Sequence, residues 1–280
     1  MSQRDSRALP DLQVLPLCRL VLHEEADPQR VARLIQQLRE DNRLKNPPVV
    51  APILGTDRYV VLDGANRVTA LMQMGFPHVV AQVVRYEDPG VELDTWYHVV
   101  AGIRREEFSA ALERVAGMHL VPSTLDEARE ALAIGDAVAY IVFADAVYQV
   151  HNGSPGRRND IRLLNDLVAA YKGRARIYRA SNDVFAKQAP IHPDITALVV
   201  FPKYRPADIM ALARNGDRVP TGITRHIIPG RALRINLPLS FLLEDKPLAE
   251  KQAWLQQWIR DRANANKIRF YSESTFLFDE

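Results

Sequence analysis

The sequence is poor in cysteine, in long apolar runs and in net charge, and each shortage excludes a class of protein. One cysteine, Cys18, cannot form an internal disulfide framework, which favours a reducing compartment. The longest apolar run, Ala137–Ala144, is far shorter than the ~20 residues that cross a bilayer. The first ten residues also lack an apolar signal region. We therefore expect a cytoplasmic protein without a membrane partner.

The formal net charge is only +2 and the pI is about 8.7. This mild excess is below the level typical of strong DNA binding, but it suits anionic small molecules such as nucleotides. The sequence also lacks a Walker A loop, a GxGxxG turn after a strand, an HExxH helix and a paired CxxC. The apolar share of 47% and the length of 280 residues are typical of a globular protein, and we expect two domains.

The first hundred residues predict a compact α+β unit, because short apolar runs alternate with segments of helical period. The Asp27-Pro28 pair marks the start of its first helix, since proline is favoured at the first helical position. The expected strands are Leu12–Leu22, Val49–Ile53, Arg58–Leu62 and His78–Val84.

The later sequence predicts a second, α/β domain, with the boundary near residue 104. We therefore expect domains at 1–104 and 105–280. Just before the boundary, Trp96–Ile103 has the composition of a strand. Glu127 follows Thr124 at capping-box spacing, which predicts a helix start. The other expected elements include a hairpin around Asp145, helices over Asn159–Tyr171 and Ala249–Ala263, and a strand near Leu233–Leu237.

The stretch Val60–Gly75 changes from a buried-strand pattern to helical spacing, so Asp63–Arg67 lies at a strand-to-helix turn. The first N–H groups of a helix lack backbone acceptors, and the helix dipole favours an anion there. Arg67 is unfavourably placed in this first turn unless an anion lies beside it. The turn is therefore a candidate phosphate site.

Asp63 admits two interpretations, which can coexist. A magnesium-nucleotide site needs a carboxylate beside the phosphates, so Asp63 could bind Mg²⁺ or orient a reacting hydroxyl. The same position also suits a plain helix N-cap in front of Gly64.

Two further polar clusters have both a functional and an ordinary interpretation. His23-Glu24-Glu25 follows a strand, and adjacent carboxylates at such a turn are usually surface charges, although an oriented glutamate can act as a general base. Thr224-Arg225-His226 offers a hydroxyl, a guanidinium and an imidazole, or else forms an ordinary strand edge.

These motifs together resemble a known family. HEE before a helix, NPPVVAPI, a hairpin and DGANRVTALMQMG resemble the ParB/sulfiredoxin-like fold, in which a glycine-led loop feeds a phosphate-binding helix. The later TWY and GITRHIIP segments are similar to those of the free-serine kinases on this fold, the archaeal ADP-dependent enzymes and a bacterial ATP-dependent enzyme of siderophore precursor synthesis.

The resemblance implies a kinase that transfers a phosphoryl group from ATP or ADP, with Mg²⁺, to the hydroxyl of free L-serine or a close relative. It implies that Glu24 is the base and that Asp63 assists at the same hydroxyl or at the metal. Trp96, with His23, would form the amino-acid pocket. The nucleotide phosphates would be held by Gly64, Asn66, Arg67, Thr224, Arg225 and His226.

The chain departs from the kinase pattern at one point, because those kinases usually read DGHHR or DGTHR and this chain has Ala65-Asn66 between Gly64 and Arg67. This departure and several basic spots keep an alternative open: a non-enzymatic ParB-like regulator that responds to a nucleotide or metabolite, with DNA as a less favoured partner. A DNA clamp is disfavoured because a GERR box is missing, and sulfiredoxin activity because no cysteine follows the glycine. A nuclease ranks last, because no two-metal carboxylate cluster is evident.

Overall fold

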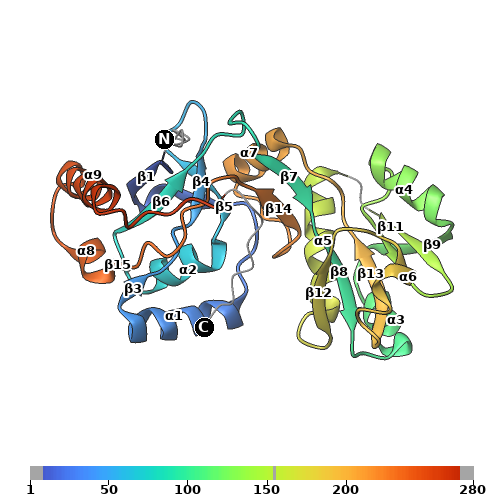
Figure 1. Cartoon of the computed structure of the whole chain (residues 1–280). Coiled ribbons are helices and arrows are strands. Elements are labelled where there is room, and N and C mark those ends of the chain that lie inside the picture. The colour runs from blue at the N-terminus through green and yellow to red at the C-terminus, as the bar shows by residue number, and fades with distance from the viewer. Residues whose placement is uncertain (1–8, 154–155, 272–280) are drawn as a thin grey trace, which may run out of the picture. The chain divides into compact units, whose positions relative to one another are not determined.

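The computed structural model describes residues 9–153 and 156–271, and the chain divides into two compact units (Figure 1). The first unit combines the segment up to Val21, Pro28–Gly90 and the segment from Ile228 onward, and the second combines Leu22–Asp27 with Val91–Ile227. The expected boundary at residue 104, with 105–280 as one domain, is therefore wrong. Within the described residues, no helix is both long and apolar enough to cross a membrane.

The first unit contains a five-stranded mixed sheet of order β1-β6-β4-β5-β2. Strand β4 runs parallel to β6, whereas β1 pairs with β6 and β5 with β4 in antiparallel fashion. Helices α1 and α2 pack on each other, and α8 and α9 return from the end of the chain to β6 and β1. The bounds are β1 Leu12–Pro16, β2 Leu20–Leu22, α1 Pro28–Asp41, β3 Arg43–Leu44, β4 Val49–Pro52, β5 Tyr59–Asp63, α2 Ala65–Gln73, β6 His78–Val83, β15 Leu237–Pro238, α8 Leu239–Leu243 and α9 Leu248–Asn264.

Two expected strands of this unit differ in the structure. A short 3-10 helix, Leu17–Arg19, interrupts the segment expected as one strand over Leu12–Leu22. Its two halves become β1 and β2, which lie at opposite ends of the strand order. The strand expected at Leu233–Leu237 is reduced to the two residues of β15, because Arg234 and Asn236 have φ angles of 52° and 49°, which an extended strand excludes.

The second unit contains a six-stranded sheet of order β12-β8-β13-β10-β11-β9, with helices on both faces. Adjacent residues of β8 show the two faces: Val99 belongs to a core cluster with Ala128 of α4, whereas His98 bonds to Tyr171 at the end of α5. The mixed α/β class expected for the second domain is confirmed. The bounds are β7 Glu92–Thr95, β8 Tyr97–Ala101, α3 Arg105–Glu113, β9 Met118–Ser123, α4 Leu125–Ile134, β10 Ala139–Val142, β11 Val147–Asn152, α5 Arg157–Tyr171, β12 Arg176–Ala180, α6 Phe185–Gln188, β13 Ile195–Val200, α7 Pro206–Asn215 and β14 Thr224–Ile227.

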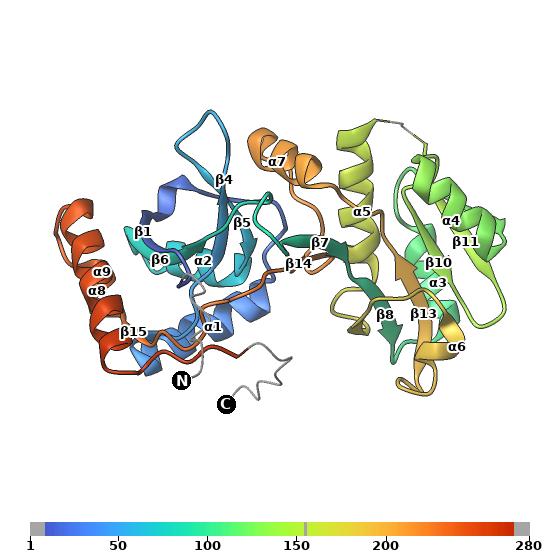
Figure 2. The ribbon, with the colours of Figure 1, turned by 45° about the horizontal axis from the view of Figure 1, so that its top comes forward.

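A separate two-stranded ladder of the second unit positions the candidate site. Strands β7 and β14 pair antiparallel, with Thr95 opposite Thr224, and Figure 2 shows them side by side. Trp96 lies between β7 and β8, so the strand expected over Trp96–Ile103 begins one residue later. This ladder brings the TWY and TRH segments together although they are far apart in the sequence.

Candidate active site

The turn that carries His23 and Glu24 is attached to the second unit by a short backbone ladder. The N–H of Glu25 donates to the Val219 carbonyl at 2.8 Å, and the N–H of Val219 donates to the His23 carbonyl at 2.9 Å. These two bonds flank Glu24, which forms a parallel bridge with Val219. The ladder therefore fixes the backbone from which the Glu24 side chain projects.

The Glu24 carboxylate is half-buried and held by three donors. Its Oε2 accepts from the Gly222 N–H at 3.1 Å, and its Oε1 accepts from the Thr224 N–H at 2.8 Å and also from the Thr224 hydroxyl. Glu25, by contrast, is exposed. The two adjacent glutamates are thus not an equivalent surface pair, because only the first is oriented by the 222–224 segment.

The hydrogen bonds around the Thr224 hydroxyl indicate which ring nitrogen of His23 carries a proton. Its Nε2 lies 2.9 Å from the Thr224 hydroxyl oxygen, and the side chain is only 2% exposed. Because the hydroxyl has one hydrogen and donates it to Glu24 Oε1, the contact with His23 is satisfied when the imidazole donates from Nε2. A carboxylate oxygen has two acceptor positions. The described contacts fill both on Oε1 and one on Oε2, so one position on Oε2 stays open.

Arg225 and Trp96 form the neighbouring wall of this group. The Arg225 guanidinium lies over the Trp96 ring, 4.2 Å from its centroid, and pairs with Asp94 at 3.5 Å. The backbone N–H of Trp96 donates to the Ile223 carbonyl at 2.8 Å, which holds the indole beside β14. A stacked guanidinium of this kind is a good partner for a carboxylate or phosphate. His226 lies edge-on to His23, with 5.4 Å between ring centroids.

The second group of expected site residues lies in the first unit, at the start of α2. Gly64 is the N-cap residue, with φ 95°, and the described chain gives this helix no side-chain cap. Asp63 ends β5, and its carboxylate pairs with Arg231. The interpretation of Asp63 as the N-cap is therefore wrong. Its side chain instead pairs with Arg231, a neighbour that the sequence patterns did not indicate.

Local crowding explains the glycine before α2. A Cβ on Gly64 would lie 3.0 Å from the Pro48 Cβ and 2.8 Å from the Arg67 Nη1. Its left-handed φ also disfavours any other residue. The first turn of α2 contains no acidic residue, while Arg67 projects a half-buried guanidinium there. Asn66 lies in the same turn. This is the arrangement of an anion site at a helix N-terminus.

The structure thus brings the expected residues together in two groups, one in each unit. His23, Glu24, Trp96 and the 224–226 segment form the group of the second unit. The residues missed by sequence reasoning are Gly222, Asp94 and Arg231, each a contact between segments distant in the chain, for which no local pattern exists. In the described ranges, no group of three or more histidine, cysteine or acidic side chains could hold a metal ion. Asp63 alone could supply one carboxylate, which suits Mg²⁺ that is bound mainly through nucleotide phosphates.

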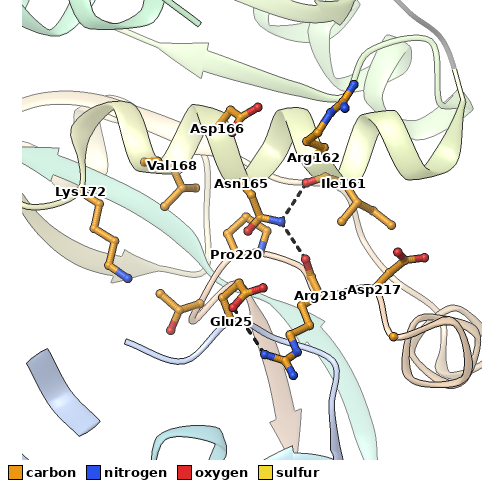
Figure 3. A pocket seen from close by; sticks show the side chains of 13 residues that line it. Glu25, Ile161, Arg162, Asn165, Asp166, Val168, Lys172, Asp217, Arg218 and Pro220 are labelled. Atoms are coloured by element: carbon orange, nitrogen blue, oxygen red, sulfur yellow. Dashed lines mark hydrogen bonds and ion pairs between the residues drawn. The ribbon is translucent and has the colours of Figure 1, made fainter. Parts of the chain in front are cut away.

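A pocket of about 550 Å³ lies behind the Glu24 turn, between α5 and the 216–221 loop (Figure 3). Glu25 lines it, whereas the Glu24 carboxylate faces Thr224, because successive residues of an extended segment point to opposite sides. The pocket is therefore not the place where Glu24 would meet a substrate.

The fold identifies the class of protein to which the chain is similar. No protein-family model matches the chain. Its fold is that of a free serine kinase, because a structure described as such, with a glutamate replaced by glutamine and in complex with AMP, superposes with a TM-score of 0.72. That match has 18% identity and covers 86% of this chain and 98% of the other.

The particular relatives are curated L-serine kinases. The ATP-dependent L-serine kinase SbnI of Staphylococcus aureus is 26% identical over 96% of this chain and 97% of its own. The ADP-dependent L-serine kinase SerK of Thermococcus kodakarensis is 20% identical over 83% of this chain and 93% of its own. The resemblance stated from the sequence motifs is therefore confirmed.

Proposed function

We propose that this protein is an amino-acid kinase that transfers a phosphoryl group from ATP or ADP to the hydroxyl of free L-serine, or of a close hydroxy amino acid, and forms O-phosphoserine. The observation that supports this proposal most directly is the orientation of the Glu24 carboxylate by three donors, which leaves one acceptor position on Oε2 unused by the described residues. The similarity to ATP- and ADP-dependent L-serine kinases along nearly the whole chain supports the same assignment.

In the proposed reaction, Glu24 Oε2 accepts the proton of the serine hydroxyl. The serine oxygen forms a bond to the terminal phosphorus of the nucleotide, and the bond from that phosphorus to the bridging oxygen breaks. The leaving group is ADP when ATP is the donor and AMP when ADP is the donor. Such transfer depends mainly on positioning and on stabilising negative charge, so one base and a few cations suffice.

The start of α2 is the proposed phosphate site. Backbone N–H groups after Gly64, the Asn66 amide and the Arg67 guanidinium would contact phosphate oxygens, and the absence of acidic residues from this first turn favours the anion. Asp63 would hold Mg²⁺, which neutralises phosphate charge when bound. This role requires Asp63 to exchange its contact with Arg231.

The serine site is proposed beside Glu24 in the second unit. Trp96 would form one wall, and His23 would keep the Thr224 hydroxyl oriented toward Glu24. The Arg225 guanidinium, stacked on Trp96, would bind an anionic group of substrate or nucleotide. His226 would complete this wall next to His23.

The test is an assay of the purified chain with Mg²⁺, either nucleotide and a panel of hydroxy amino acids, read out as O-phosphoserine by ³¹P NMR. We expect product with L-serine and with at least one nucleotide. Glu24→Gln should keep nucleotide binding, measured by calorimetry, and lose turnover. Absence of any phosphorylated amino acid would refute the proposal. Salt-sensitive DNA binding without kinase activity would favour a ParB-like regulator instead.

A further inference from the structure

The Glu24 turn depends on a support that lies behind it, away from the proposed substrate. Leu22–Asp27 belongs to the second unit, but both of its ends continue into the first unit. Its backbone is tied to Val219 by the two hydrogen bonds described above. The position of Glu24 is therefore set by whatever fixes the loop around Val219 and the far end of the turn.

Helix α5 and its C-cap residue, Lys172, reach both of these places across the pocket. The Asn165 amide nitrogen donates to the Arg218 carbonyl at 2.8 Å, directly before Val219, and to the Ile161 carbonyl of its own helix at 3.1 Å (Figure 3). The Lys172 ammonium pairs with Asp27 at 3.1 Å. Because a pocket of about 550 Å³ separates this face of α5 from the loop, polar links replace close packing there.

Exposure distinguishes these links from a weaker one nearby. The Arg218–Glu25 pair is 3.8 Å long, and its side chains are 44% and 50% exposed, so it contributes little. The side chain of Asp27 is only 17% exposed and that of Lys172 32%, which strengthens their attraction. Asn165 bonds to a backbone carbonyl rather than to a mobile side chain, so its contact fixes the chain itself.

We propose that Asn165 and Lys172 are positioning residues for Glu24. Asn165 lies within α5 and Lys172 is its C-cap residue, and both side chains line the same pocket. One fixes the loop that pairs with the turn, and the other fixes the end of the turn. Neither side chain contacts the Glu24 carboxylate, so they act through the backbone. The inference rests on the proposed kinase function in assigning a catalytic task to Glu24.

The test compares Asn165→Leu and Lys172→Met with Asp166→Asn. Asp166 is an exposed residue of the same helix that takes part in neither link. Each of the first two variants should lower kcat about 5- to 10-fold, as expected for the loss of one polar contact. The KM values for serine and nucleotide should stay within about twofold. Lys172→Arg should restore most of kcat, because it keeps the cation, and Asp166→Asn should match wild type.

Hydrogen exchange supplies a readout that does not depend on activity. The Glu25 amide, which donates to Val219, should exchange faster in Asn165→Leu and Lys172→Met but not in Asp166→Asn. Unchanged exchange and unchanged kcat in both variants would overturn the positioning role. So would a loss of kcat that disappears after correction for the folded fraction measured by thermal melting. If the wild-type protein makes no phosphoserine, only the proposed function is overturned. Hydrogen exchange of the Glu25 amide would still decide whether Asn165 and Lys172 hold the Glu24 turn in place.

Discussion

The hydroxyl of Thr224 offers a direct measure of how much the orientation of Glu24 contributes to catalysis. Thr224→Val removes this hydroxyl but keeps the side-chain shape and the backbone N–H that donates to Oε1 at 2.8 Å. A hydrogen bond to a charged group is worth about 1.5–3 kcal/mol. Since each 1.36 kcal/mol in the barrier is tenfold in rate, kcat should fall about 10- to 160-fold if the contact is needed in the transition state.

The assay is steady-state formation of O-phosphoserine, with Thr224→Ser as the matched control. Serine keeps the hydroxyl between His23 and Glu24, so its kcat should stay within about threefold of wild type. Thr224 was expected among the phosphate-binding residues, but its hydroxyl donates to Glu24 in the structure. Nucleotide affinity should therefore be unchanged in both variants, because the proposed phosphate residues at the start of α2 keep their contacts. A kcat for Thr224→Val within twofold of wild type would refute the reasoning, and so would an equal loss in Thr224→Ser.

Two further predictions concern other parts of the chain. Gly64→Ala should lower the free energy of unfolding by about 1–3 kcal/mol and weaken nucleotide binding in calorimetry, because the new Cβ would contact Pro48 and the backbone φ is 95°. The control Gly75→Ala, with φ 77° and no atom within 4 Å of the new Cβ, should show only the smaller cost of the backbone conformation. Equal losses of stability in the two variants would contradict the crowding argument. Burial lowers the pKa of His98 from 6.5 to about 3, so the contribution of the neutral imidazole to stability is fully present above pH 6.5 and is lost as the pH falls toward 3, by up to about 1.4 kcal/mol per pH unit. Chemical denaturation of wild type and His98→Gln at pH 7 and pH 4.5 should therefore show a smaller acid-induced loss of stability in the variant. Equal losses in the two proteins would exclude His98 as the cause.

Local signals in the sequence predicted most of the elements. The capping box of Thr124 and Glu127 is present at the start of α4, and the hairpin around Asp145 is formed by β10 and β11. Helix α2 starts directly after Gly64, as the change of period indicated. These features succeeded because caps, turns and hydrophobic period act over a few neighbouring residues.

The pairings between distant segments could not be predicted in the same way. Nothing in the residues near Asp63 indicates Arg231, and nothing near Glu24 indicates Gly222. The return of α8 and α9 to the first sheet likewise depends on packing across the chain. The TRH segment was assigned to the site only through the resemblance to the free-serine kinases. Its contact with Trp96 through Arg225 became visible only in three dimensions.

The long-range contacts of Glu24 have a consequence for the order of assembly during synthesis. Its partners Gly222 and Thr224 lie 198 and 200 residues later in the chain. At a synthesis rate of about 5–20 residues per second, they emerge roughly 10–40 s after the glutamate. Arg231, which pairs with Asp63, and helices α8 and α9, which complete the first unit, follow later still. Both groups of expected site residues therefore reach their described contacts only after synthesis has passed Arg231, and a product truncated before that point would lack the partner of Asp63 as well as the last part of the first unit.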